Sequence, residues 1–374
     1  MTTTEKDLAK VSDLREYLEN TPFAAEEIVM FSDGIVNFAF RIKLKTPYDG
    51  RSTMVVKHAK PYMAKLLDQD NNNIPFDLER QRYEVEALNH VHALIPPDSL
   101  VTVPRVNHFD EKENVIIMDD CGTDSVTLKK FMIDGRCTPA LAEKIGDALG
   151  SFLGGLHHTW GKNGIARLME TLREHKQGKE VCVWAVYGRL GSTIRGEDPT
   201  LNISENPPEV GETEFKRMEE IGKEISADML SEEEDLVMGD FWPGNVLIDL
   251  ADGGSDINRM FVIDWELAKP GLQALDIGEF CAEVDLIRRF HASSATVCSR
   301  MIASFYRSYS NLDVKKDVAL YQTALAHWGA HLTVWTSQGK WGGVEETRIV
   351  ITDGVKLLVE GYECPGDEIE RRYQ

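Results

Sequence analysis

Three oxygen-bearing side chains stand close together in the stretch between residues 236 and 266. The first two, Asp240 and Asn245, occur in LVMGDFWPGNVLID, and Asp264 follows in MFVIDWE. Phosphoryl transfer from a nucleotide needs a carboxylate that orients the attacking hydroxyl and accepts its proton, together with oxygen ligands for Mg²⁺. The pattern D-x-x-x-x-N followed by a second Asp supplies both kinds of group, and it is more specific than any single carboxylate.

Two short apolar segments flank these residues and predict how they are positioned. Residues 246–248 (VLI) and 260–263 (MFVI) are typical of β-strands, and Asp252-Gly253-Gly254 supplies a turn between them. We therefore expect a hairpin that delivers the three side chains to one end. The alternative is that Asp and Asn are ordinary turn residues, since the Pro-Gly-Asn at 243–245 alone fits a turn.

A second set of candidates lies nearer the N-terminus. Lys57 ends the apolar run Met54-Val55-Val56, where a cation could reach nucleotide phosphates, and Glu84 on the next predicted helix could pair with it. Glu86 competes for that pairing, and each of these charged residues, taken singly, is more often solvent-facing. The turn Ser32-Asp33-Gly34 could close over phosphates with its backbone N–H groups.

The composition limits the possible partners. The 374 residues carry 41 basic and 62 acidic side chains, a net charge of -21, and 42% of them are hydrophobic. The length predicts about two domains, and the acidic excess disfavours nucleic acid and anionic membrane surfaces as partners. The six cysteines form no C-x-x-C pair, the N-terminus has no apolar signal segment, and no apolar run approaches the ~18 residues that span a bilayer. We therefore expect free thiols and a soluble, cytoplasmic protein.

The hydrophobic patterns divide the chain into a sheet-rich part and a helical part. Strand-like segments at 35–44, 52–58 and 101–119 accompany one amphipathic helix at 76–94, and Tyr48-Asp49-Gly50 predicts a turn between the first two strands. From residue 120 onward the pattern is helical, beginning with 139–160. Residues 191–214 are polar and contain Gly, Pro and Asn, which predicts an exposed loop.

The same motifs resemble those of the aminoglycoside phosphotransferase and choline kinase group of small-molecule kinases. The group's H-G-D-x-x-x-x-N element reads Met238-Gly239-Asp240…Asn245 here, and its D-x-D/E element reads Asp264-Trp265-Glu266. The resemblance covers nearly the whole chain. It implies an α+β, bilobal protein-kinase-like fold, with a small sheet-rich N-lobe at 1–119 and a larger helical C-lobe at 120–374. Met238 departs from the group's His, a scaffold residue, so the departure concerns local packing more than activity.

The resemblance also implies roles for individual residues. Asp240 would be the catalytic base, and Asn245 and Asp264 would be the magnesium ligands. Asp276 would brace the catalytic loop. The implied cofactors are ATP, bound between the lobes with its adenine against residues 118–121, and Mg²⁺. The residues that would bind ATP are Lys57, Glu84, Asn37, Gly34, Asp119 and Cys121.

The acceptor is expected to be a small molecule that carries a hydroxyl group and binds in the helical lobe beside Asp240. An indole or another flat ring would favour aromatic walls, and an ammonium group would favour a carboxylate or a cation–π contact. The alternative for each candidate is a core residue on a helix face. The candidates are Trp242, Glu283, His331 and Trp335, with His327 and Trp341 as further ones.

The identity of the acceptor is less constrained than the reaction. Stretches such as LVMGDFWPGNVL and IDWELAKPG resemble those of kinases in this group that phosphorylate 4-hydroxytryptamines, and the resemblance implies an acceptor of that type. Methylthioribose is the alternative, although Glu346-Thr347-Arg348 lacks the paired arginine of kinases that phosphorylate this sugar. A nucleotide-binding scaffold without catalysis is disfavoured by the intact motif. A protein kinase is disfavoured because no A-P-E closes an activation segment and D-W-E stands in place of D-F-G.

Overall fold

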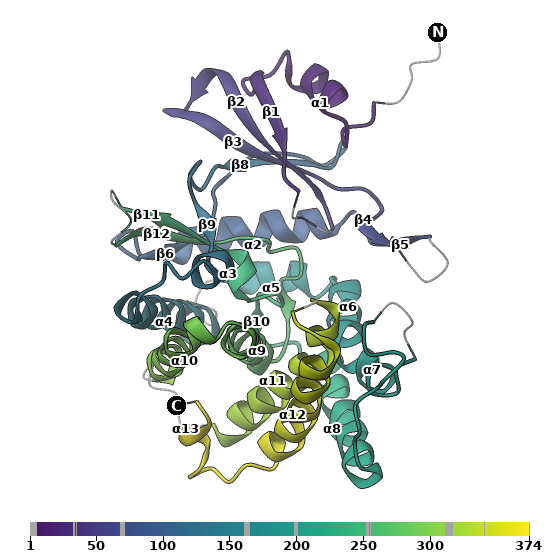
Figure 1. Ribbon diagram of the computed structural model, residues 1–374. Coiled ribbons are helices and arrows are strands. Elements are labelled where there is room, and N and C mark those ends of the chain that lie inside the picture. The colour runs from purple at the N-terminus through teal and green to yellow at the C-terminus, as the bar shows by residue number, and fades with distance from the viewer. Residues whose placement is uncertain are drawn as a thin grey trace. The chain divides into compact units, whose positions relative to one another are not determined.

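The computed structural model describes residues 6–32, 34, 36–67, 72–160, 165–197, 201–251, 254, 256–310, 317–339 and 341–373. The chain forms two units, one of residues 1–95 and 102–125 and the other of residues 96–101 and 126–374 (Figure 1). The lobe boundary after residue 119 stays a prediction. Within the described residues, no helix combines the length and the apolar character needed to cross a membrane.

The first unit is built on a five-stranded antiparallel sheet in the order β1-β2-β3-β8-β7. Phe40 and Ile42 of this sheet are buried against Leu14 and Leu18 of helix α1. The strands are β1 (Ala25–Met30), β2 (Phe38–Tyr48), β3 (Arg51–His58), β7 (Val106–Asp110) and β8 (Val115–Asp119). The unit also contains α1 (Val11–Leu18), α2 (Arg80–Leu94) and the pair β4 (Tyr62–Leu67) and β5 (Asn73–Pro75).

The turn between β2 and β3 is the one that the sequence predicts. Tyr48 pairs with Arg51, and the two residues between them, Asp49 and Gly50, have φ of 49° and 77°. Positive φ at both central positions is the type I′ geometry that suits the twist of two antiparallel strands, and Asp-Gly favours it. This hairpin places Lys57 inside the sheet, on the strand between β2 and β8.

The second unit is mainly helical. Helix α11 packs against α9 and α12, and α4 packs against α10. The longer helices are α4 (Pro139–Gly154), α6 (Lys176–Val186), α8 (Glu212–Ser231), α9 (Gln273–Phe290), α10 (Ala295–Ser310), α11 (Val318–Gln338) and α12 (Val344–Tyr362). The shorter ones are α3 (Leu128–Ile133), α5 (Ala166–Leu172), α7 (Leu190–Ile194) and α13 (Ile369–Arg372), with 3₁₀ turns at Tyr187–Arg189, Pro243–Asn245 and Ala292–Ser294.

Short strands of the second unit frame the motif residues. Strand β11 (Val246–Leu250) lies between β9 (Val126–Thr127) and β12 (Ile257–Val262), and β10 (Leu236–Val237) pairs with β13 (Lys269–Pro270). Strand β6 (Val101–Thr102) lies where the chain passes from one unit to the other. The predicted hairpin at 246–263 is therefore confirmed, although residues 252 and 253 of its predicted turn lie outside the described residues.

Several predicted elements are present with shifted ends. The helix expected at 76–94 begins at Arg80, and the helix expected at 139–160 is α4 followed by a π-helical turn at Gly155–Trp160. The exposed loop expected at 191–214 is wrong in part. Leu201 and Ile203 are only 5% and 0% exposed because they pack in one core with α7 and α8. All six cysteines are free thiols, as predicted.

Candidate active site

The loop that carries Asp240 leaves β10 through a glycine that no other residue can replace without strain. Gly239 has φ of 80°, and a Cβ there would collide with the Lys269 Nζ and the Leu267 carbonyl oxygen. The loop is also fixed on its other side, because the ring of Phe241 is fully buried among other aromatic rings of the second unit. Asp240 is thus held between the tight turn at Gly239 and the buried side chain of Phe241.

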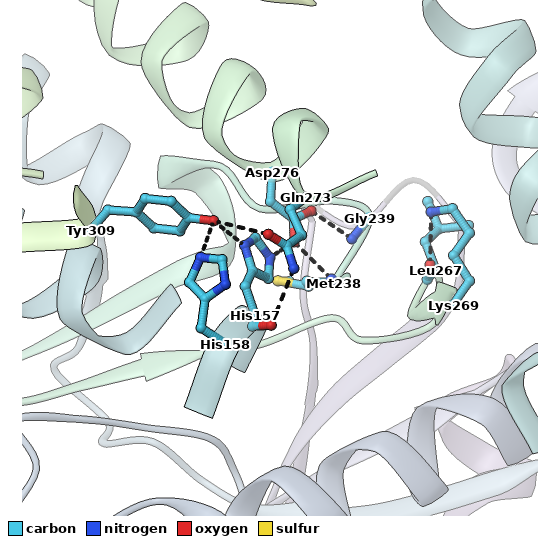
Figure 2. Close-up of polar contacts among 9 residues, drawn as sticks. All are labelled: His157, His158, Met238, Gly239, Leu267, Lys269, Gln273, Asp276 and Tyr309. Carbon is cyan, nitrogen blue, oxygen red and sulfur yellow. Dashed lines mark hydrogen bonds and ion pairs between the residues drawn. The ribbon is translucent and has the colours of Figure 1, made fainter. Parts of the chain in front are cut away.

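A buried carboxylate on α9 holds the start of this loop. The two oxygens of Asp276 accept hydrogen bonds from the backbone N–H groups of Met238, at 2.9 Å, and Gly239, at 2.8 Å (Figure 2). Asp276 is fully buried, so these bonds to a carboxylate are strong and their loss is costly. The family resemblance implies that Asp276 braces the catalytic loop, and these two hydrogen bonds fit that role. The contribution of Asp276 to activity stays a prediction.

A histidine from outside the motif completes the brace. His157 Nε2 lies 3.2 Å from Asp276 Oδ2, and its Nδ1 lies 2.9 Å from the Tyr309 hydroxyl, which also contacts His158 at 3.1 Å (Figure 2). A carboxylate only accepts hydrogen bonds, so His157 donates from Nε2 and accepts at Nδ1 from Tyr309. Met238 itself is fully buried in the position where the family usually has His. The imidazole beside Asp276 therefore comes from residue 157.

Replacing Asp276 by asparagine tests this brace. We expect the variant to lose about 2–4 kcal/mol of stability, because an amide nitrogen would face one of the two backbone N–H donors. The melting temperature should fall by about 5 °C or more. Asp249→Asn is the matched control, since Asp249 on β11 receives a hydrogen bond from Asn258 at the surface. Equal melting temperatures for the two variants would contradict the role of Asp276.

The structure brings the three motif residues together at one end of the β11–β12 hairpin. Asn245 Nδ2 donates to Asp240 Oδ2 at 2.7 Å and to the Asp240 carbonyl oxygen at 3.0 Å. Across the hairpin, the Ile263 N–H donates to the Asn245 carbonyl at 2.9 Å, which places Asp264 next to Asn245. Asp264 has φ of 67°, a left-handed conformation that Asp and Asn tolerate better than other side chains.

The carboxyl groups of this site repel one another. Burial raises the pKa of Asp240 to about 7, and the negative charges of Asp264 and Glu266 act in the same direction. Glu279 on α9 shares a hydrogen bond with Asp240, and burial together with the charge of Asp240 raises the pKa of Glu279 well above its usual value. The pKa values of both carboxyl groups are therefore raised by burial and by their closeness to each other. Sequence reasoning missed Glu279, because an acidic residue on a helix carries no signal of its own.

The oxygen atoms of this site fit a hard cation. Among the described residues, no three His, Cys, Asp or Glu side chains are arranged to hold a metal ion by themselves. Mg²⁺ is usually bound by one or two protein oxygen ligands, with phosphate oxygens and water completing its shell. Asn245 and Asp264 supply such a pair, and the mutual repulsion of the nearby carboxylates would be relieved by a cation.

In the first unit, Lys57 and Glu84 form a buried ion pair. The Lys57 Nζ lies 2.7 Å from Glu84 Oε2, and the two side chains are 10% and 1% exposed. Glu86 instead lies near His90 of the same helix. The sequence leaves open whether Glu84 or Glu86 pairs with Lys57. In the structure, Glu84 is the partner. The reason is helical phase, because Glu84 shares the buried face of α2 with Leu88 and Val91.

Two of the other residues predicted to bind ATP, Asn37 and Asp119, have polar partners within the first unit. Asn37 accepts a hydrogen bond from the fully buried Arg80, and Asp119 pairs with Arg51 at 2.6 Å. Burial raises the pKa of the Cys121 thiol, so this side chain is neutral. Gly34 is described, whereas residues 33 and 35 beside it are not. The roles of these four residues toward ATP stay predictions.

The residues predicted to bind the acceptor gather in the second unit. Glu283 Oε1 lies 3.1 Å from His331 Nε2, and the His331 ring stacks on Trp335 with centroids 5.8 Å apart. Lys129, which sequence reasoning missed, places its Nζ 3.0 Å from Glu283 Oε2 and 4.9 Å from the centroid of the Trp242 ring. These contacts join all four predicted residues in one cluster.

Of the further candidates, His327 is a core residue. It is buried, its Nδ1 lies 3.0 Å from the Tyr187 hydroxyl, and burial lowers its pKa to about 3. A neutral, hydrogen-bonded histidine in this setting stabilises the packing of α11. Trp341, in contrast, joins the acceptor cluster, because its ring lies 4.1 Å from the Lys129 Nζ.

Comparison with known proteins identifies the class. Residues 49–297 match the phosphotransferase enzyme family, known as APH, and the chain belongs to that family. It is a small-molecule phosphotransferase, and the predicted α+β fold, with an N-terminal antiparallel sheet and a helical C-terminal part, is confirmed. The AMP-bound spectinomycin phosphotransferase APH(9)-Ia has a similar fold, with a TM-score of 0.53 and 13% identity over 93% of this chain and 97% of that one.

Two fungal enzymes are similar over most of the length. The 4-hydroxytryptamine kinase of Psilocybe cyanescens is 29% identical over 96% of this chain and 94% of its own. The 4-hydroxytryptamine kinase of Psilocybe cubensis is 30% identical over 87% of this chain and 84% of its own. Methylthioribose kinase 1 of Oryza sativa subsp. japonica is 26% identical over 68% of this chain and 54% of its own.

Proposed function

We propose that this protein transfers the γ-phosphoryl group of ATP to a hydroxyl of a small aromatic amine of the 4-hydroxytryptamine type. The observation that carries the proposal is the arrangement of Asp240, Asn245 and Asp264 at the end of one hairpin. Phosphoryl transfer depends almost entirely on positioning and on electrostatic stabilisation, and this arrangement supplies both.

Asp240 is the residue that acts on the acceptor. Its carboxylate orients the attacking hydroxyl and accepts the hydroxyl proton as the bond to phosphorus forms. The raised pKa of about 7 makes this carboxylate a stronger base than an ordinary aspartate. Asn245 restricts the Asp240 side chain through its hydrogen bond at 2.7 Å, and Asp276 holds the loop from which Asp240 projects.

The phosphates need positive charge and fixed donors. Mg²⁺, when bound, neutralises charge on the phosphate oxygens, and Asn245 and Asp264 are the residues that would hold it. We assign Lys57 to the ATP phosphates, with Glu84 fixing its side chain in place. Gly34, Asn37, Asp119 and Cys121 remain proposed ATP-binding residues.

Replacing Lys57 by methionine tests that assignment. We expect the KM for ATP to rise at least about tenfold, because a fixed cation at the phosphates is lost. The double variant Lys57→Met/Glu84→Gln avoids leaving a buried carboxylate unpaired. Lys43→Met is the matched control, since Lys43 lies on the neighbouring strand β2 and pairs with Glu26 at the surface. A KM for ATP unchanged in both Lys57 variants would refute the assignment.

The acceptor is proposed from the two 4-hydroxytryptamine kinases and from the chemistry of the Glu283 cluster. A panel of acceptors decides it: 4-hydroxytryptamine, its N-methylated forms, methylthioribose, choline and an aminoglycoside, each with ATP and Mg²⁺. Mass spectrometry reads the addition of one phosphoryl group. We expect the highest kcat/KM for the hydroxytryptamines. A higher kcat/KM for methylthioribose would overturn the proposed acceptor but keep the reaction.

A further inference from the structure

The ammonium group of Lys129 sits in a cage made of one carboxylate and two indole rings. Its Nζ lies 3.0 Å from Glu283 Oε2, 4.1 Å from the centroid of the Trp341 ring and 4.9 Å from that of Trp242. We call Glu283, Trp242 and Trp341 the ammonium cage. A carboxylate together with aromatic ring faces is an environment that recognises organic ammonium ions.

The aromatic walls of the cage are held in place by their neighbours. The Trp242 ring folds back over Gly244 and fills the space that a Cβ at position 244 would need. The Trp341 ring stacks on Phe290, with centroids 6.0 Å apart and an interplanar angle of 23°. The cage therefore does not depend on Lys129 for its shape, and a site built in advance loses little entropy when a ligand binds.

The carboxylate of the cage and the Lys129 ammonium group inside it differ in how easily each side chain can move away. The Glu283 side chain is 8% exposed on a long helix, whereas the Lys129 side chain is 28% exposed on a flexible stem of four methylenes. Burial alone would raise the pKa of Glu283, but the hydrogen bond from His331 and the charge of Lys129 hold it below its usual value. Glu283 thus stays ionised and needs a cation beside it, while Lys129 can reach water.

One buried polar atom beside the cage has no hydrogen-bond partner among the residues that the structure describes. His331 is 3% exposed, and among the described residues its Nδ1 makes no hydrogen bond, although its Nε2 contacts Glu283. A buried nitrogen without a partner destabilises the protein unless a ligand or a water satisfies it. With the stacked Trp335 ring next to it, this atom offers a polar contact for a flat ligand.

The distance from the cage to the catalytic residue limits the ligand. Glu279, which hydrogen-bonds Asp240, and Glu283 lie four residues apart on α9, so they share one face about 5–6 Å apart. A ligand with its hydroxyl at Asp240 and its ammonium group at Glu283 must span at least about one helical turn. A hydroxylated aromatic ring with an aminoalkyl chain has such a span, whereas a single-carbon amine does not.

From these observations we infer that Lys129 is a built-in placeholder, whose ammonium group occupies the position of the acceptor's own ammonium group and leaves the cage when the acceptor binds. The inference rests on the proposed function, since it concerns the acceptor of the same reaction. It assigns the acceptor to the class of hydroxylated aromatic compounds with a protonated aminoalkyl chain. Lys129 then sets specificity, because only a ligand cation can replace it beside Glu283.

The test is the binding of tryptamine, which has no hydroxyl to phosphorylate, compared with the neutral 3-ethylindole. Isothermal titration calorimetry on Lys129→Met should show tryptamine binding about tenfold tighter than to the unchanged protein, because the competing cation is gone. The affinity for 3-ethylindole should change less than about twofold. Lys130→Met is the matched control, since Lys130 is 63% exposed and pairs with Asp134. Weaker or unchanged tryptamine binding by Lys129→Met would overturn the inference.

Further variants separate the possible failures. Trp341→Leu and Glu283→Gln should each weaken tryptamine binding about tenfold or more. If Lys129→Met does not fold, Lys129→Ala gives the same comparison, and no gain in tryptamine affinity there counts against the inference. Tryptamine binding that follows these expectations in a protein that phosphorylates no hydroxytryptamine would refute the proposed function and leave the cage assignment in place.

Discussion

Replacing Asp240 by asparagine is expected to lower kcat by about three orders of magnitude while the fold stays intact. The amide has the shape of the carboxylate and keeps an oxygen for the hydrogen bond from Asn245, so the loop should not move. It cannot accept the proton of the acceptor hydroxyl, and general-base catalysis contributes roughly 10²–10⁴-fold. The KM for the acceptor should change little. Steady-state kinetics with 4-hydroxytryptamine and ATP measures both constants.

The control for this variant is Asp249→Asn, the same substitution on the hairpin but away from the motif. It should retain the kcat and the melting temperature of the unchanged protein. A kcat within about tenfold of normal for Asp240→Asn would show that another group accepts the proton. A parallel fall in melting temperature would mean that the loss reflects unfolding, and then Asp240→Glu gives the deciding comparison.

Replacing Asp264 by asparagine is expected to lower kcat about a hundredfold or more and to raise the Mg²⁺ concentration needed for half-maximal rate. The charge that would hold the cation is lost, while one oxygen remains. Asparagine is the right substitution because residue 264 has φ of 67°, which Asn tolerates. Alanine at this position would add backbone strain of about 1–2 kcal/mol, so a loss of stability would accompany the loss of the charge.

Calorimetric titration of the Asp264→Asn variant with a non-hydrolysable ATP analogue, with and without Mg²⁺, tests the same point without turnover. The gain in affinity that Mg²⁺ provides should be reduced in the variant. If Mg²⁺ strengthens analogue binding equally in both proteins, Asp264 is not a ligand of the cation. Trp265, which is fully buried and donates to the Val262 carbonyl at 3.0 Å, should keep the neighbouring backbone in place.

The hairpin that carries the motif was predictable because its signals are local. Two apolar runs flank the motif residues, and their antiparallel pairing places the start of the first strand, next to Asp240 and Asn245, beside the end of the second, next to Asp264. The same holds for the β2–β3 turn, where Asp49-Gly50 has a strong conformational preference of its own. Local turn preferences and the antiparallel pairing of neighbouring strands were sufficient to predict these parts of the fold.

The sequence contains the information that selects Glu84 as the partner of Lys57, but it becomes visible only when the faces of helix α2 are considered. Both Glu84 and Glu86 lie on α2, and only the phase with Leu88 and Val91 separates them, since residues at i, i+4 and i+7 share a helix face. The buried ion pair to Lys57 follows from that phase. Helical phase, which can be read from the sequence alone, therefore favours Glu84 over Glu86.

Other parts of the site depend on contacts between residues far apart in the chain. His157 meets Asp276 across 119 residues, and Lys129 meets Glu283 across 154. No local pattern marks such pairs, because each residue alone resembles a surface charge or a core histidine. The buried apolar residues Leu201 and Ile203 were missed for a related reason, since polar neighbours obscure them and only tertiary packing decides their burial.

In the proposed mechanism, three carboxyl groups on one face of α9 would serve three different parts of the reaction. Asp276 holds the loop, Glu279 contacts Asp240, and Glu283 belongs to the ammonium cage, at spacings of three and four residues. On this proposal, the helical pitch of about 5.4 Å sets the shortest acceptor that could reach both Asp240 and Glu283. Moving the last carboxyl group by one turn would select a shorter or longer aminoalkyl chain while the machinery around Asp240 stays the same.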